Sequence, residues 1–479
     1  MSYIGRGTDK ISNVEKLDNI SFSGSTATFN LTKGGTAFIP SSAECIRLAI
    51  DGIEQGNNYT VSGSQITFDF TPSGSSTNNW IYHIGVGVIT TPADGSVTEA
   101  KIGSSAVTTA KINDGAVTSG KIASGVIPDA VSLRPNANPL IINGDMAVAQ
   151  RGTSVSGASS SGYKAVDRYR HTISIGTWTI SQSTDTPSGQ GFLNSMKMDC
   201  TTAEASPGSS DTLIFQQKIE PQNLILLKKG TSNAEKITIA FWIKATKTGT
   251  NILELFDNNN NRQVSKAYTI SSSDTWEKKV INFPADTTGV LANNNNSFNV
   301  SFYLGAGSNF TSGTLNTSWS AYVNANRVVG QVNHGDSTSN NVYITGIQLE
   351  VGEYSSTTIP PFQHESFGDN LARCQRYLEF SSDYGADYTS GVNSCVIMDM
   401  GGSHPIYVPM SYNVYKRAAP TMTFYNGNSG ATGTWRTNAS TDVSISGTSI
   451  SSQGFSTNSA DLGGDGRSSN GTWKAESEL

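Results

Sequence analysis

The sequence of 479 residues has few cysteines and no long apolar run. Its four cysteines are far apart, with no Cys-x-x-Cys pair, so neither a zinc site nor a disulfide framework is expected. No window approaches the roughly 20 apolar residues that a membrane-spanning helix needs. The N-terminus lacks the apolar core of a secretion signal, so we expect synthesis in a cytoplasm and no membrane insertion.

Charge is also scarce. Charged residues make up 15% of the chain, and the formal net charge of -6 comes without a basic run. A nucleic acid or an anionic membrane is therefore not an expected partner. The 48 glycines and the abundant Ser, Thr and Asn indicate short strands with many turns. The length exceeds what one core supports, so the sequence predicts a mostly β protein of several domains.

Motifs of catalysis are missing as well. The sequence has no Gly-x-Ser-x-Gly, no His-Glu-x-x-His and no Gly-x-x-x-x-Gly-Lys followed by Ser or Thr, and no two of its five histidines stand at metal-ligand spacing. We predict no catalytic residue, no metal and no cofactor. Polysaccharide hydrolysis needs only two carboxylates brought together by the fold, for which Asp383, Asp387 and Asp399 are candidates. Each stands near glycine, where a turn explains it more simply. "FDNNNNRQ" and "DLGGDG" do not follow calcium-loop spacing and are predicted to be exposed turns.

Residues 96–127 repeat every ten residues, with a branched apolar side chain at every fifth position. A spacing of five scatters these side chains around a helix and alternates them between the faces of a strand. One unit buries too little to offset the entropy of ordering it, whereas three chains around an axis would stack rings of side chains. A flexible Ser/Thr/Gly linker is the alternative. The predicted core of this trimeric shaft is Val97, Ile102, Val107, Ile112, Val117, Ile122 and Ile127.

Composition divides the chain into five segments. Alternation in "CIRLAIDGIEQGNNYTVSGSQITFDF" predicts an N-terminal β domain over residues 1–90, and residues 91–137 hold the shaft and a Pro-rich linker. Residues 138–352 alternate apolar and polar positions in long strands, as in "KITIAFWIKA" and "FNVSFYLGA", which predicts a jelly-roll-like β-sandwich. Residues 353–380 form a connector, and residues 381–479 form a C-terminal β tip.

The connector contains the one convincing helix, "SFGDNLARCQRYLEF". Ser366 or Asp369 can cap it, and Leu371, Cys374 and Leu378 fall on one face at spacings of three and four.

The C-terminal tip has the composition of a sugar-binding surface, because its tyrosines and tryptophan stand among Asn and Asp. An aromatic ring can stack on a sugar ring while amides and carboxylates bind the hydroxyls. Alternation in "PIYVPMSYNVY" places some tyrosines on the surface and others in the core. We predict Tyr412, Tyr415 and Trp435 as surface groups that bind a ligand, with His404 in a neighbouring Gly/Pro loop.

Several segments resemble a module of bacteriophage tail fibres, especially those of phages that infect marine bacteria. They are "NPLIINGDMAVAQRGTS", "DRYR", "ITGIQLEVG" and "PFQHESFGDNLARCQRYLEF", together with the shaft repeat and the final "GTWKAESEL". The segment "IPSSAECIRLAIDGIEQGNNYTVSGSQITFDF" is more loosely similar to the tail-attachment end of podovirus-type fibres. These matches extend from about residue 38 to the C-terminus, but residues 381–479 match only at their ends.

The resemblance implies a homotrimeric fibre of the virion tail. Residues 1–90 would bind the tail or an adaptor protein, and the β modules would meet a host polysaccharide or lipopolysaccharide. Trimerisation would sum individually weak sugar contacts into firm attachment. Two alternatives stay open: a tailspike that degrades polysaccharide, and an adaptor that links the tail to a separate receptor-binding protein.

Overall fold

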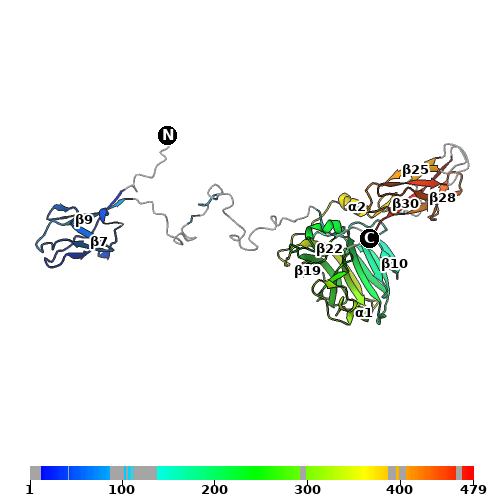
Figure 1. Cartoon of the computed structure of the whole chain (residues 1–479), viewed down its shortest axis with the longest axis horizontal. Helices are drawn as coiled ribbons and strands as arrows, with labels where there is room; N and C mark the ends of the chain where they lie inside the picture. Colours follow the sequence, from blue (N-terminus) through cyan, green and yellow to red (C-terminus); the bar gives the residue numbers. More distant parts are fainter. Residues whose placement is uncertain are drawn as a thin grey trace. The chain divides into compact units, whose positions relative to one another are not determined.

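The computed structural model describes residues 12–40, 42–86, 138–291, 298–386, 395–398, 406–459 and 467–479, with short pieces at 102–103, 106–108 and 112. The chain divides into two units, Met1–Lys121 and Ile122–Leu479. The first is blue in Figure 1, and the second runs from cyan through green to red. Antiparallel strands dominate both, so the prediction of a mostly β protein is confirmed.

The N-terminal unit contains two small antiparallel sheets and a two-stranded ribbon around one core. Ile46, Leu48 and Ile50 alternate into this core, where they meet Ile66 and Phe68, as their sequence spacing predicts. The first sheet has the order β1 (Ser12–Lys16), β9 (Trp80–Val86), β5 (Ile46–Ile50) and β6 (Ile53–Gln55); the second has β2 (Thr28–Asn30), β8 (Gln65–Phe68) and β7 (Tyr59–Ser62); the ribbon is β3 (Thr32–Lys33) and β4 (Thr36–Ala37).

The shaft repeat is described at three of its seven apolar positions. Ile102, Val107 and Ile112 are 46%, 55% and 43% exposed in the single chain. Val97, Val117, Ile122 and Ile127 lie outside the described residues. The shaft conformation and the trimer therefore stay predictions.

The larger unit is built on a β-sandwich of a six-stranded and a seven-stranded antiparallel sheet. Its core joins alternate residues of both sheets, such as Ile239 and Phe241 with Val300 and Phe302. The first sheet has the order β10 (Ser154–Ala158), β13 (Thr177–Ser183), β14 (Ser195–Thr202), β22 (Asn341–Val351), β16 (Ile237–Ala245) and β19 (Glu277–Phe283); the second has β11 (Gly162–Tyr163), β12 (Tyr169–Ile173), β15 (Thr212–Ile219), β20 (Phe298–Ala306), β17 (Gly249–Asp257), β18 (Arg262–Ile270) and β21 (Ser320–Ala321).

Three short helices lie in the described connections of the sandwich. The 3-10 helix η7 (Pro221–Leu227) follows β15, while α1 (Ser308–Thr311) and η8 (Asn324–Asn326) follow β20. Residues that follow α1 and η8 pack on the outer face of the second sheet, where Val328 joins a small apolar cluster with Ile214 and Tyr303.

Helix α2 (Phe367–Gln375) begins at the predicted cap. The Ser366 hydroxyl oxygen accepts a hydrogen bond from the Asp369 backbone N–H, at 3.2 Å. Cys374 is buried against the sandwich, with Leu371 half-buried beside it. The prediction that Leu378 lies on the apolar face of this helix is wrong. The helix ends at Gln375, and Leu378 starts strand β23 (Leu378–Phe380), where it pairs with Glu476.

The C-terminal domain is a curled eight-stranded arrangement around its own aromatic core (Figure 1). Its central strand is β30 (Ser468–Glu476), which pairs with four others. The order is β23, β30, β27 (Thr434–Thr437), β28 (Asp442–Thr448), β29 (Gly454–Ser459) and β25 (Ile406–Ser411), and β24 (Cys395–Met398) and β26 (Thr421–Asn426) also pair with β30.

Candidate functional site

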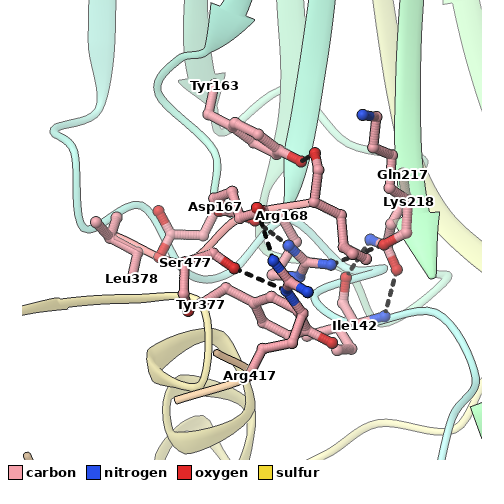
Figure 2. Close-up of polar contacts among 12 residues, drawn as sticks. Ile142, Tyr163, Asp167, Arg168, Gln217, Lys218, Tyr377, Leu378, Arg417 and Ser477 are labelled. Carbon is pink, nitrogen blue, oxygen red and sulfur yellow. Dashed lines mark hydrogen bonds and ion pairs between the residues drawn. The ribbon is translucent and has the colours of Figure 1, made fainter. Parts of the chain in front are cut away.

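The last residues of the chain return from β30 to the sandwich and form a buried joint (Figure 2). Arg168, with a side chain 1% exposed, forms an ion pair with Glu478. Its guanidinium also lies 3.3 Å from the centre of the Tyr377 ring. Burial alone would lower the pKa of Arg168, but the Glu478 carboxylate raises it above its ordinary value. The Tyr163 hydroxyl donates to the Leu479 carbonyl oxygen at 3.0 Å, so the chain end is fixed to the sandwich.

A second arginine extends this joint. The Arg151 guanidinium lies 2.7 Å from Glu476, 3.3 Å from Glu478 and 3.7 Å from Asp167. Burial raises the pKa of Asp167 to about 6, and Arg151 opposes that rise. The segments "AQRG", "DRYR", "CQRYLEF" and "WKAESEL", which carry the sequence resemblance, thus supply side chains to one structural joint. The side chains of Arg151, Asp167, Arg168 and Glu478 are at most 11% exposed, so these charges are not available for recognition.

A fully buried ion pair holds the turn that follows β25 in the C-terminal domain. Lys416 and Glu379 are both 0% exposed and in contact. The Lys416 ammonium also donates to the Gln375 carbonyl oxygen at 2.5 Å, and the Asn413 N–H donates to Glu379 at 2.9 Å. Burial lowers the pKa of Lys416, while Glu379 opposes the shift. The pair fastens the Asn413–Lys416 turn to the end of α2 and to β23.

The four predicted ligand residues fall into three places. Trp435 is 0% exposed and Tyr412 is 8% exposed, and both belong to the aromatic core of the C-terminal domain. The prediction that they are surface groups is wrong. Trp435 packs over Gly471, where a Cβ atom would lie 2.4 Å from the indole ring. Tyr415 is 66% exposed, and its ligand role stays a prediction. His404 lies outside the described residues.

The open face of strands β28, β29 and β25 presents a different tyrosine. Tyr407 is 59% exposed, whereas its neighbours Val408 and Met410 pack against the core. The strand register places Tyr407 beside Asn458, and Asn458 beside Ser446. The next row along the strands is Pro409, Ser456 and Thr448, and Ser411 then pairs with Gly454.

These rows contain an exposed aromatic ring, one amide and several hydroxyl groups, and no charged residue. A phenol ring offers a flat apolar face, and the amide and hydroxyls both donate and accept hydrogen bonds. Side chains on a paired strand point away from the sheet at fixed spacings, so the rows form a regular platform. Such a surface suits a neutral polyhydroxylated ligand.

Tyr407 was not among the predicted residues, but the sequence contains the signal. In "IYVPMSY", Val408, Met410 and Tyr412 share one parity, and Tyr407, Pro409 and Ser411 share the other. The more apolar set faces the core.

Asp383 is the one candidate carboxylate that lies within the described residues. Asp383 lines a cavity of about 240 Å³ with Tyr384, Gln150 and Asn413, and the residues that line it include no second carboxylate. Asp387 and Asp399 lie outside the described residues, as does "DLGGDG". Within the described part of the chain, no three His, Cys, Asp or Glu side chains cluster as metal ligands would. None of the helices described there has the length and apolar character to span a bilayer.

The prediction of an exposed turn at "FDNNNNRQ" is wrong for its aspartate. Asp257 has a side chain 1% exposed, and the Lys229 ammonium lies 3.1 Å from it and 2.6 Å from Asp286. Burial opposes ionisation, yet the Lys229 and Arg262 hydrogen bonds lower the pKa of Asp286 to about 2. The Lys229 ammonium therefore compensates the negative charge of both buried carboxylates, and Arg262 adds a second positive charge beside Asp286.

No protein-family model matches the sequence, and no curated protein matches it. Solved structures with partly similar folds include the enzymatically active domain of tailspike protein 4 of bacteriophage CBA120, at 12% identity and TM-score 0.24, over 44% of this chain and 21% of that one. Another is a family 11 carbohydrate-binding module from Clostridium thermocellum in complex with a β-1,3-1,4-mixed-linked tetrasaccharide. It matches at 13% identity and TM-score 0.20, and the match covers 44% of this chain and 99% of that one. A family 61 carbohydrate-binding module in complex with β-1,4-galactotriose matches at 9% identity and TM-score 0.23, and the match covers 45% of this chain and 99% of that one. The chain spans about a fifth of the tailspike structure, and at these scores the matches carry no conclusion about function.

Proposed function

We propose that this chain is a non-enzymatic, homotrimeric bacteriophage tail fibre whose C-terminal β domain binds a neutral glycan on the host surface. Residues 1–90 join it to the tail or to an adaptor, as the sequence resemblance implies. The observation that carries the recognition role is the open, uncharged face with Tyr407 at its edge strand.

The position of this face supports the role. The buried Arg168–Glu478 pair fastens the end of this domain to the sandwich, and the buried Lys416–Glu379 pair holds its Asn413–Lys416 turn against α2. A platform fixed in this way loses little conformational entropy when a ligand binds, which favours affinity. A single aromatic platform gives weak binding, and three copies on one fibre would multiply it.

The test is binding of the full chain to an array of bacterial polysaccharides and lipopolysaccharide O-chains. We expect Tyr407→Ala to weaken binding by about tenfold or more, which is about 1.4 kcal/mol. Tyr407→Phe keeps the ring and should retain most of the affinity. The matched control is Val396→Ala, which removes an apolar group 55% exposed on β24, outside the platform.

Three outcomes would contradict the proposal. Unchanged binding by Tyr407→Ala would remove the platform from recognition. Release of reducing sugar ends by the purified chain would favour the tailspike alternative. Failure to bind any glycan or any host cell, with intact binding to a tail protein, would favour the adaptor.

A further inference from the structure

We propose that the β-sandwich carries a second sugar site, a pocket that takes a neutral pyranose ring. The pocket has a volume of about 380 Å³, which is within the usual range for small-molecule sites. It lies where the Gly191–Asn194 segment, the approach to α2 and the Asp145 loop meet. It shares no residue with the Tyr407 platform, so it stands without the proposed function.

Three of the ten residues that line the pocket carry aromatic rings. Phe192, 8% exposed, is the buried one and is called the floor below; it packs edge-on against Phe362, with ring centres 5.1 Å apart. His364 is an exposed wall, with its ring centre 5.4 Å from that of Phe192. Phe367, the first residue of α2, is a second wall and is 47% exposed.

The floor depends on a glycine. Gly346 has φ +62°, and a Cβ atom there would lie 2.6 Å from the Phe192 ring. Any other residue would push this ring out of place. The backbone of β22 is therefore shaped to seat Phe192 beneath the pocket.

Polar groups complete the pocket, and their neighbours hold them. The Asn370 amide, from a residue 3% exposed, donates to one oxygen of the Asp145 carboxylate at 3.2 Å. The Thr345 hydroxyl donates to the Asn194 carbonyl oxygen at 2.7 Å, which fixes that segment on the sheet. Glu365 is engaged with the Arg373 guanidinium at 2.5 Å. The pocket therefore presents an oriented carboxylate and amides beside exposed rings.

This combination selects the ligand class. Aromatic walls take the apolar C–H face of a sugar ring, while a carboxylate and amides bind adjacent hydroxyl groups. Asp145 and Glu365 both line the pocket, so an acidic sugar would meet like charge and lose affinity. A neutral pyranose matches the rings and the charge together.

The test is saturation-transfer NMR on the full chain with methyl glucoside, methyl galactoside and methyl mannoside as probes, and methyl glucuronide as the acidic comparison. We expect transfer from at least one neutral probe, and weaker transfer from the glucuronide. Transfer should persist in Tyr407→Ala and fall by about tenfold or more in Phe367→Ala and in Asp145→Asn.

Asp145→Asn preserves the volume of the side chain, so it carries the test if Phe367→Ala lowers the melting temperature. The inference is overturned if no neutral probe gives transfer with the wild-type chain. It is also overturned if transfer survives Asp145→Asn but disappears in Tyr407→Ala, because the sugar would then bind at the C-terminal platform. Equal or stronger transfer from the glucuronide would overturn the selection for a neutral ring.

Discussion

At the scale of single residues, two buried histidines couple the sandwich to pH. His171 and His334 are both 0% exposed. Burial lowers the pKa of His171 to about 3 and that of His334 to about 4, and the nearby Lys164 and Lys247 add to the respective shifts. In the unfolded chain both titrate near pH 6.5. Their neutral forms therefore favour the fold fully above that pH, and this stability is lost as the pH falls toward 4 and 3.

We predict that His171→Leu reduces the acid sensitivity of the sandwich. Between about pH 6.5 and pH 5, one such histidine removes about 2 kcal/mol from the free energy of unfolding. The variant should lack this loss, so its melting temperature should fall less than that of the wild type over the same interval. Asp167 has a raised pKa and acts in the opposite sense, but it is present in both proteins.

Circular dichroism melts at several pH values measure the effect. Parallel pH dependence of the two proteins would contradict a neutral, buried His171.

The ligand residues show how far sequence reasoning reaches at this scale. Residue types indicated correctly that the C-terminal segment has exposed aromatic groups, and Tyr415 is one of them. Choosing among them needed the strand faces. On β27, Trp435 points into the core, and the next residue, Arg436, points to the other face. Tyr412 lies an even number of positions from Val408 and faces the core with it. The Phe192 pocket had no local signal, because its residues come from three separate segments.

At the scale of elements, β30 and the residues after it tie the C-terminal domain together. β30 pairs with β23, β24, β26 and β27, and Glu478 then reaches Arg168 in the sandwich. The sequence predicted β24 and β26 among these strands, and α2 from its cap, but it placed Leu378 of β23 in the helix and gave no signal for β27 or β30. It could not predict their pairing, because partners such as Cys395 and Gly471 are far apart in the chain.

We predict that Glu478→Gln destabilises this joint by about 3 kcal/mol or more, because it leaves Arg168 buried without its carboxylate. Urea unfolding measures the loss, and limited proteolysis should find the C-terminal domain more readily cleaved. Glu353→Gln is the matched control: its pair with Lys236 is more than half exposed on both sides and should contribute less than about 1 kcal/mol. If both substitutions lowered the free energy of unfolding equally, the buried Arg168–Glu478 pair would contribute no more to stability than an exposed one, and the prediction would be wrong.

At the scale of the whole molecule, the proposed trimer depends on the shaft repeat. Ile102, Val107 and Ile112 expose about half of their side chains to water in the single chain. Burial of such a side chain in a shared core contributes roughly 1.5–3 kcal/mol relative to full exposure. If three chains shared these side chains in rings, their burial would offset the entropy lost when each repeat is ordered. A single chain buries too little apolar surface to do so.

We predict a particle of about 152 kDa, three times the 50.7 kDa of one chain, in light scattering. Ile102→Ser, Val107→Ser and Ile112→Ser combined should shift the mass toward that of the monomer at low concentration. Thr108→Ala changes a polar position between the apolar ones and should leave the mass unaltered. A monomeric wild-type chain at all concentrations would contradict the shared core.

The C-terminal domain begins and ends on neighbouring strands, since β23 pairs with the last residues of β30. Its two connections to the sandwich are thus one strand spacing apart, about 4.8 Å, however much chain lies between them. A foreign β domain whose two ends lie on neighbouring strands would match this spacing. We therefore expect that spacing to be the geometric requirement for exchanging the domain between α2 and the final residues.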